Sequence, residues 1–434
     1  MSISPAPEET RSFSLTTLTQ YSFLLFVFSL GFMQPYLNVS KYRVPYSDII
    51  FLVTFSFWSM TLLLKKTRFR WHQGYWIIIV YFISMLFSTV LSVDPRASLV
   101  KLLGESYLLS LPVLTFNIVR DERQFRHLTY GWLAATAVAV IVGLISILLF
   151  YVDPSNVLLL HTKFPFGTLP PGNYFRLQST FLNGNMLCNY LGISLLLLLA
   201  ARRLGWIGRE RSIVLIAGIV ICSISTISPG LGGIALSIGI WVWATRRGAT
   251  SRLALATLIT ATAISIAFLF AVAISPNRQP DPPIALDLPG TEQRIDPSAR
   301  ALTWIASGKT FADNPFFGRG LGQDACDVRY HPLAGGMHIL TDAHNVFLNV
   351  AAQQGVFGLA AILLIAIYMT RLSYLSGRND PNNRILIVAL GTAFFSSFVY
   401  QGIGGSFEDA RFIWVLIGMI FSATGLSELR SSSQ

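Results

Sequence analysis

The sequence predicts an all-α, polytopic integral membrane protein with about twelve transmembrane helices and one large helical loop. Hydrophobic residues make up 53% of the 434 residues, charged residues make up only 12%, and the mean hydropathy is +0.57. Soluble globular domains carry about 25% charged residues. Apolar runs long enough to cross a bilayer also recur along the whole chain. These observations exclude a soluble globular domain.

The predicted spans form two membrane regions separated by a polar loop. Residues 1–274 form a bundle of about nine helices with an outward loop at 153–183, residues 275–342 form a loop with short helices, and residues 343–434 supply the last three helices. The spans are expected at 18–37, 47–64, 74–93, 98–119, 128–152, 184–201, 212–228, 230–245, 252–274, 355–371, 384–403 and 410–427. The closely spaced seventh and eighth ranges are equally consistent with one broken helix.

Basic residues alternate between successive connections. The clusters at 65–70, 120–126, 202–211, 246–252 and 371–384 are rich in arginine or lysine, and the connections between them are poor in both for their length. By the positive-inside rule the rich connections are cytoplasmic. Both termini then face the cytoplasm, and the loops 153–183 and 275–342 face outward. This topology explains the net charge of +11 without nucleic acid, so the expected partners include membrane lipids and no nucleic acid.

Two ionisable residues fall inside the fourth span. Lys101 and Glu105 are four residues apart and therefore lie on one face of a helix. Ionisable groups within a span are costly and usually face the bundle interior or a wet cavity. A structural ion pair and a role in lining an active cavity are both consistent with this pattern.

The first outward loop holds one arginine close to the membrane surface. Glycine and proline make the early part of this loop irregular, and Asn183 or Asn185 leads into the sixth span. Arg176 is consistent with a solvated surface residue. It is also consistent with a functional one, because it shares the outward side with a later histidine, His344.

The larger outward loop contains its own helix. Asp296 and Pro297 have the pattern of an N-cap followed by proline at the first helical position, which predicts a helix over 297–312. This helix carries Arg300 and Trp304, and it ends at Asn314-Pro315. A turn with the pattern G-x-G-x-G follows at 318–322. The turn is no dinucleotide fingerprint, because no strand precedes it.

The stretch 341–358 marks the boundary between the polar loop and a hydrophobic run. Asp342 or Thr341 is placed to cap the helix, which would put His344 and Asn345 in its first turn. The positive end of a helix favours anions and neutral imidazole, and a neutral imidazole can act as a general base. The alternative is that His344 only lines a loop. His331 and His338 lie in the same loop, but no predicted helix fixes either ring.

The order of these motifs resembles the O-antigen ligase superfamily, which also includes O-antigen polymerases and protein O-oligosaccharyltransferases. The resemblance covers about Arg176 to Leu372. One difference is that many members carry S-x-S-R before the eighth span, whereas this chain reads Ser225-Thr226-Ile227-Ser228-Pro229 and lacks the basic group. The matching elements are Arg176, R-x-x-x-W at Arg300 to Trp304, N-P-x-x-G-x-G-x-G at Asn314 to Gly322, and A-H-N-x-x-L at Ala343 to Leu348 with Gly355 and Gly358.

The resemblance implies transfer of an O-antigen glycan from undecaprenyl diphosphate to a sugar hydroxyl of lipid A-core. The reaction would take place at the periplasmic face of the bacterial inner membrane, during lipopolysaccharide maturation. Arginines would hold the diphosphate leaving group, and a histidine would take the acceptor proton. The expected catalytic residues are His344, Arg300 and Arg176, and the expected substrate-binding residues are Arg319, Asn345, Lys101, His338 and Trp304.

The resemblance also implies an inverting, metal-independent reaction without a cofactor. We find no Asp-x-Asp motif or paired carboxylate on the outward side, so a divalent metal is not required. Cys188, Cys222 and Cys326 show no metal-ligand spacing and are expected to be structural.

Two other functions are compatible with the sequence. An O-antigen or exopolysaccharide polymerase would use the same donor and differ only in the acceptor pocket, which no motif identifies. A non-enzymatic transporter of a lipid-linked sugar would be expected to show an internal repeat with matched broken helices, and no convincing repeat is found.

Overall fold

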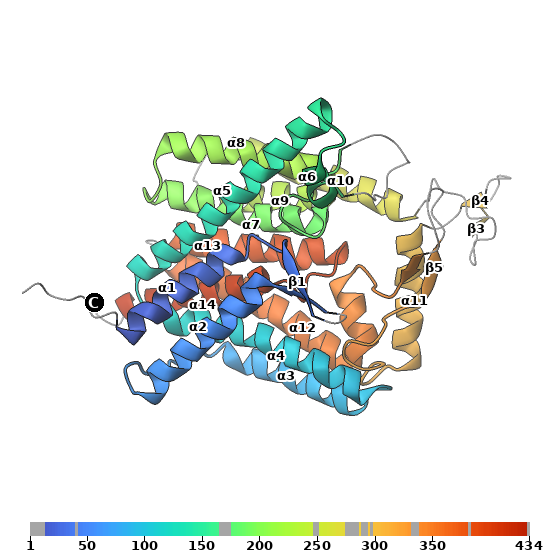
Figure 1. Cartoon of the computed structure of the whole chain (residues 1–434), viewed down its shortest axis with the longest axis horizontal. Coiled ribbons are helices and arrows are strands. Elements are labelled where there is room, and N and C mark those ends of the chain that lie inside the picture. The colour runs from blue at the N-terminus through green and yellow to red at the C-terminus, as the bar shows by residue number, and fades with distance from the viewer. Residues whose placement is uncertain are drawn as a thin grey trace, which may run out of the picture.

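The computed structural model shows a bundle of long helices that run side by side (Figure 1). It describes residues 14–39, 42–164, 175–245, 251–273, 286–287, 294–295, 298–330, 338–380 and 383–431. One helix, α11 (Ala299–Asp313), stands across one end of the bundle, which we call the cavity end. The first described helix begins, and the last one ends, at the opposite end (Figure 1).

A described helix overlaps each of the predicted spans. Seven described helices are long and apolar enough on their own to cross a membrane, and four further apolar helices are shorter. The prediction of an all-α membrane protein is therefore confirmed. The long helices are α1 (Leu15–Ser29), α2 (Tyr46–Leu63), α3 (Tyr75–Val90), α4 (Pro95–Ile118), α5 (Glu122–Val152), α7 (Gly184–Arg203), α8 (Arg209–Ser225), α9 (Gly230–Thr245), α10 (Ser251–Ala273), α12 (Val346–Asn379), α13 (Arg384–Phe394) and α14 (Arg411–Ser431).

The remaining elements are short. A π-helix, η1 (Phe395–Tyr400), and a 3-10 turn, η2 (Gln401–Ile403), extend α13, and α6 (Val157–Thr162) lies in the first long connection. Within the described residues, six short strands form three antiparallel two-stranded ribbons. They pair β1 (Tyr36–Val39) with β2 (Tyr42–Pro45), β3 (Leu286–Asp287) with β4 (Arg294–Ile295), and β5 (Val328–Tyr330) with β6 (His338–Leu340).

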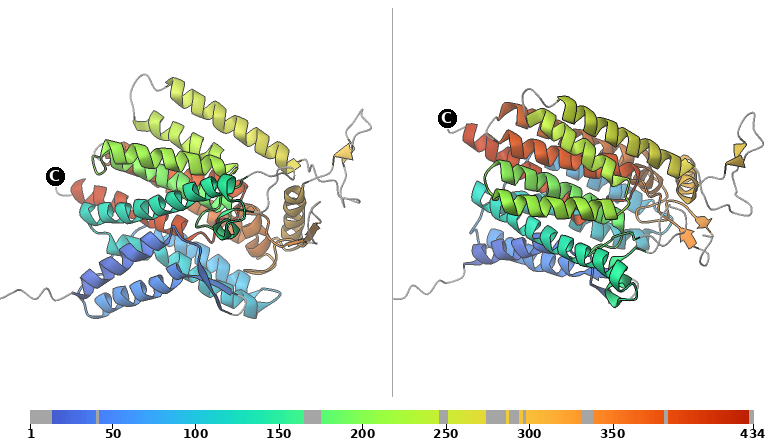
Figure 2. Two further views of the ribbon diagram at one scale, coloured as in Figure 1. Left: turned by 45° about the horizontal axis from the view of Figure 1, so that its top comes forward. Right: turned by 90° about the horizontal axis from the view of Figure 1, so that it is seen from above.

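The core of the bundle is built around α14 and α7. Side chains along 412–423 of α14 are almost all buried, and 83% of the apolar window of α7 is buried inside the protein. By contrast, only 11% of the corresponding window of α10 is buried. Figure 2 shows α13 and α14 between the group of α8 to α10 and the group of α1 to α4. The exposed apolar side chains of the outer helices fit a lipid surround.

The helix starts follow the predicted capping chemistry only in part. Asn183 caps α7, accepting a hydrogen bond from the Met186 N–H at 2.8 Å, as one of the two predicted alternatives. The predicted cap of α11 was wrong, because Ser298 caps it by accepting from the Ala301 N–H at 3.3 Å. Asp296 and Pro297 lie outside the described residues.

The seventh and eighth predicted spans are two separate helices. A turn at 226–229 separates α8 from α9, and Ile227 there has φ 47°. The tenth predicted span began too late, since α12 starts at Val346 and is interrupted at Gly355, where φ is 68°. The hydropathy pattern missed the first part of α12 because it carries the polar residues Asn349, Gln353 and Gln354.

Candidate functional site

A cavity of about 840 Å³ opens at the cavity end of the bundle. It lies where segments distant in sequence meet. The lining includes Lys101 and Glu105 from α4, Arg176 and Asn185 before and at the start of α7, Arg300 from α11, the segment 339–344, Asn349 to Gln354 from α12, and the loop 405–409 before α14. A smaller pocket of about 140 Å³, lined largely by apolar side chains of α10 and of 400–407, shares Asn185, Pro229 and Phe407 with this cavity.

Arg176 is fixed by the turn between α8 and α9. Its Nε donates to the carbonyl of Thr226 at 3.1 Å, and its Nη2 donates to Asn185 Oδ1 at 3.2 Å. The guanidinium also lies over the Phe164 ring, 5.0 Å from the centroid. The side chain is buried, with 9% exposed, so Arg176 is a held residue of the cavity wall and not a solvated surface residue.

Arg300 projects into the same cavity from the first turn of α11. Its guanidinium lies 5.1 Å from the centroid of the Phe268 ring, and it makes no ion pair within the described residues. Burial, together with the nearby charge of Arg176, lowers the pKa of Arg300 to about 10. Two neighbouring guanidinium groups in a partly buried position favour a bound anion between them.

His344 lies before the helix, not in its first turn as predicted. Its φ is 49°, and the N-cap of α12 is the next residue, Asn345. Asp342 Oδ1 accepts from the His344 backbone N–H at 2.5 Å and lies 3.3 Å from Nδ1 of the imidazole. The turn geometry thus fixes a side chain that is 46% exposed and lines the cavity.

The pKa of His344 is lowered, as the sequence predicts, but the cause differs from the predicted helix end. Burial is the largest effect, the Asp342 carboxylate opposes it, and the nearby Arg300 charge adds to it. A lowered pKa keeps the imidazole neutral near pH 7. His344 is therefore in the protonation state that a general base needs.

Asn345 does not orient His344. Its Oδ1 accepts from the backbone N–H groups of Phe347 at 3.0 Å and Leu348 at 3.1 Å, so its side chain is used as the helix cap. The residue that contacts the imidazole is Asp342, which the sequence predicts only as a cap of the following helix. Ser406 also donates to Asp342 Oδ1. This contact joins residues 342–344, which we call the histidine turn, to the loop before α14.

The glycine-rich turn clasps the break in α12. The backbone N–H of Arg319 donates to Ala352 O at 2.9 Å, and that of Gly320 donates to Gln353 O at 3.0 Å. Gly318, Gly320 and Gly322 all have positive φ, and a Cβ at Gly318 would collide with the backbone of Gln353. This contact explains the spacing of the motif, because only glycine permits both the dihedral angles and the approach.

Several predicted substrate-binding residues lie elsewhere. The side chain of Arg319 is exposed and does not line the cavity, and Trp304 lies on α11 outside the lining. His338 lies in β6, where its backbone pairs with Tyr330, and its side chain lies outside the described part of the chain. His331 also falls outside the described residues.

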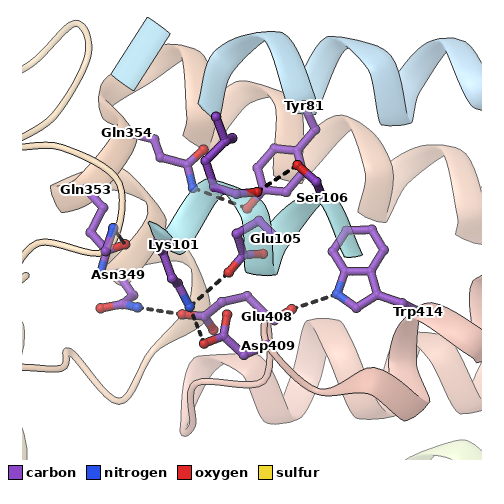
Figure 3. Close-up of polar contacts among 12 residues, drawn as sticks. Tyr81, Lys101, Glu105, Ser106, Asn349, Gln353, Gln354, Glu408, Asp409 and Trp414 are labelled. Atoms are coloured by element: carbon purple, nitrogen blue, oxygen red, sulfur yellow. Dashed lines mark hydrogen bonds and ion pairs between the residues drawn. The ribbon is translucent and has the colours of Figure 1, made fainter. Parts of the chain in front are cut away.

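The wall formed by α4 and the loop before α14 carries carboxyl groups, and we call Lys101, Glu105, Glu408 and Asp409 the carboxyl wall (Figure 3). Lys101 Nζ lies 2.9 Å from Glu105 Oε1 and 2.5 Å from Asp409 Oδ2. Lys101 is therefore ion-paired and also lines the cavity, so the two roles left open by the sequence are compatible. Glu408 Oε1 accepts from Asn349 Nδ2 at 2.5 Å, and the Glu408 backbone carbonyl accepts from Trp414 Nε1 at 2.7 Å.

Glu408 and Asp409 are two adjacent carboxyl groups that line the cavity, although the sequence predicted no paired carboxylate there in the setting expected for a metal site. The sequence signal was present, since two acids stand side by side between the last two spans. Burial, and after it the charges of Asp409 and Asp342, raise the pKa of Glu408 to about 8. Burial would raise the pKa of Asp409 as well, but Lys101 outweighs it and lowers the pKa to about 2. Within the described residues, no group of three or more histidine, cysteine or acidic side chains could hold a metal ion, and Cys188, Cys222 and Cys326 are buried and free.

Comparison with known proteins bears on this arrangement directly. Residues 189–363 match the family model described as O-antigen ligase. This segment contains Arg300 and His344, whereas Arg176 and the carboxyl wall lie outside it. The sequence resemblance is thereby confirmed, and it implies glycosyl transfer with lipid-linked glycan substrates in general. No curated protein matches the chain.

Proposed function

We propose that this O-antigen ligase family protein transfers an O-antigen glycan from undecaprenyl diphosphate to a sugar hydroxyl of lipid A-core, at the periplasmic face of the inner membrane. The observation that carries the proposal is the placement of Arg176, Arg300 and His344 around one cavity. A paired anion site next to a neutral imidazole matches a reaction that needs a diphosphate leaving group and a deprotonated hydroxyl.

The bond changes follow from these positions. The acceptor hydroxyl oxygen attacks the anomeric carbon of the donor glycan, and His344 takes the hydroxyl proton. The bond between the anomeric carbon and the phosphate oxygen breaks, and its electrons remain on undecaprenyl diphosphate. Arg176 and Arg300 stabilise the charge that grows on this oxygen. A single displacement of this kind inverts the anomeric configuration, and the two arginines supply the positive charge without a metal.

The smaller pocket supports a lipid-linked donor. We call the part of the cavity wall formed by Arg176 and Arg300 the arginine side. Phe268, Leu269, Ile403 and other largely apolar side chains line the smaller pocket, which adjoins this arginine side. A diphosphate held by Arg176 and Arg300 would leave the first part of its polyprenyl chain next to this apolar surface.

The experiment uses purified protein with lipid-linked O-antigen and two separate acceptors, lipid A-core and a second copy of the lipid-linked glycan. We expect transfer to lipid A-core, unchanged by a chelator, with inversion at the new bond. Chain extension on the lipid-linked acceptor instead would identify a polymerase. Movement of donor across vesicles without any new glycosidic bond would identify a transporter and contradict the proposal.

Single cysteines test the proposed orientation. Asp327 lies at the cavity end and Glu210 at the start of α8, and both are exposed. Because the native cysteines are buried, Asp327→Cys should react with an impermeant thiol reagent in intact spheroplasts, and Glu210→Cys should react only after lysis. The reverse pattern would show that the cavity faces the cytoplasm.

A further inference from the structure

The carboxyl wall differs in chemistry from the arginine side of the same cavity, and the proposed mechanism uses only the arginine side. Three carboxyl groups, on Glu105, Glu408 and Asp409, accompany one ammonium group, on Lys101. The side chains of Asp409 and Lys101 are 51% and 34% exposed, so both present polar atoms to the cavity. Figure 3 shows these groups converging beside Asn349.

Glu408 adds an unsatisfied hydrogen-bonding group to this wall. The residue is 8% exposed and lines the cavity, and its Oε1 is bound by Asn349. Its other oxygen, Oε2, is buried and has no hydrogen-bond partner among the described residues. A buried carboxyl oxygen without a partner costs free energy. A ligand with hydroxyl groups, which donate as well as accept, would remove this cost.

The carboxyl wall is tied to the histidine turn. Asn349, which binds Glu408, also accepts from the Ala343 backbone N–H at 3.4 Å. Ser406, two residues before Glu408, donates to the same Asp342 oxygen that faces the His344 imidazole. A molecule held on the carboxyl wall would therefore lie close to the turn that carries His344.

We propose that Glu408, Asp409, Lys101 and Asn349 form the acceptor subsite, and that it takes a sugar residue carrying no phosphate or carboxylate group. Sugar hydroxyls match the carboxyl, ammonium and amide groups of the wall. An anionic substituent would gain no free cation on this wall, because Lys101 is already paired with Glu105 and Asp409, and it would lie close to the Asp409 carboxylate. The difference in charge keeps the two substrates apart, since the diphosphate is attracted to the arginines and gains no such attraction on the carboxyl wall.

This inference rests on the proposed function, and its test separates the two. Purified protein is given the lipid-linked donor and either of two synthetic acceptor saccharides. The saccharides are identical except for a phosphate monoester on the terminal sugar. Donor binding and donor turnover are measured in the same samples. Failure to turn over donor with any acceptor would count against the proposed function, and only the acceptor comparison bears on the subsite.

We expect the wild-type protein to prefer the uncharged acceptor by at least about tenfold in kcat/KM. Asp409→Asn keeps the size of the side chain and an acceptor oxygen but removes one negative charge, so the preference should fall several-fold. Glu408→Gln should raise the acceptor KM by a few-fold and leave the donor KM unchanged. Asp327→Asn removes an exposed carboxylate outside the cavity lining and should change neither value.

Three results would overturn the subsite assignment. The first is equal use of the two acceptors by the wild-type protein, which needs no variant and so does not depend on correct folding of one. The second is an Asp409→Asn protein with the wild-type preference for the uncharged acceptor. The third is a Glu408→Gln protein whose defect falls on the donor KM.

Discussion

The arginine side and the carboxyl wall of the cavity balance their charges in different ways. Arg176 and Arg300 lie next to each other, and each guanidinium packs on a phenylalanine ring. On the carboxyl wall, Lys101 is paired with both Glu105 and Asp409. The arginine side keeps positive charge that a ligand can neutralise, whereas the carboxyl wall has balanced much of its charge internally. This difference indicates a diphosphate site on one side and a site for uncharged, hydroxyl-rich groups on the other.

The largest effect is expected at the histidine between the two sides. His344→Ala should lower the transfer rate by about 10²–10⁴-fold, the usual loss for a positioned general base, while donor binding remains. His161→Ala is the matched control, because His161 is exposed and lies outside the cavity lining. Rates of transfer and donor binding would be measured on both proteins. Near-normal transfer by His344→Ala would show that the proton goes elsewhere.

The next effect concerns the fork geometry of the arginine side. Arg176→Lys and Arg300→Lys keep the positive charge but lose bidentate contact, and each should lower kcat/KM for the lipid-linked donor by about tenfold to 100-fold. Arg319→Lys, on an exposed arginine outside the lining, should remain near the wild-type value. Steady-state kinetics with varied donor would check this. If all three variants behaved alike, the cavity arginines would not be the diphosphate site.

A smaller effect should appear at Asp342, where the two sides meet. The Asp342 carboxylate raises the pKa of His344, against burial and Arg300, which lower it. Asp342→Asn removes this charge, so the pKa of His344 should fall further and the acid limb of the pH–rate profile should move to lower pH. The rate at neutral pH should fall by less than about tenfold, because a base of lower pKa is weaker. A limb that moves to higher pH would contradict the charge coupling.

The smallest expected effect is a change in the pH dependence of stability, and it tests the carboxyl wall alone. Burial and the charges of Asp409 and Asp342 raise the pKa of Glu408 from 4.5 to about 8. The raised pKa means that this group's contribution to stability is fully present below pH 4.5 and is lost as the pH rises through about 8. Glu408→Gln cannot ionise, so its Tm should gain on the wild-type Tm by a few degrees between pH 5 and pH 8. Parallel melting curves across that range would argue against a buried neutral Glu408.

The positions of the membrane helices could be predicted because hydropathy and capping are local properties. The eighth predicted span matches α9 (Gly230–Thr245) to the residue. Asn183 caps α7 by accepting a hydrogen bond from the backbone N–H of Met186, three residues further on. The errors also have a local cause. The tenth predicted span began too late because Asn349 and Gln353 face a polar cavity, and a hydropathy window cannot distinguish such residues from a loop. The predicted cap at Asp342 or Thr341, by contrast, placed the helix start a few residues too early.

The resemblance to the O-antigen ligase family, and the choice of Arg300 and His344 as candidates, were accessible from sequence because the order of short motifs can be recognised without knowledge of the fold. What surrounds these residues was not accessible. Arg176 is held by the Thr226 carbonyl, His344 is held by Asp342, and Lys101 on α4 meets Asp409 in the loop before α14, far along the chain. Each contact joins segments, or fixes a turn, whose geometry depends on how the whole bundle packs. The hydrogen bonds and ion pairs form only after burial of the apolar helices has brought the segments together, so only the tertiary structure decided which charges face each other across the cavity.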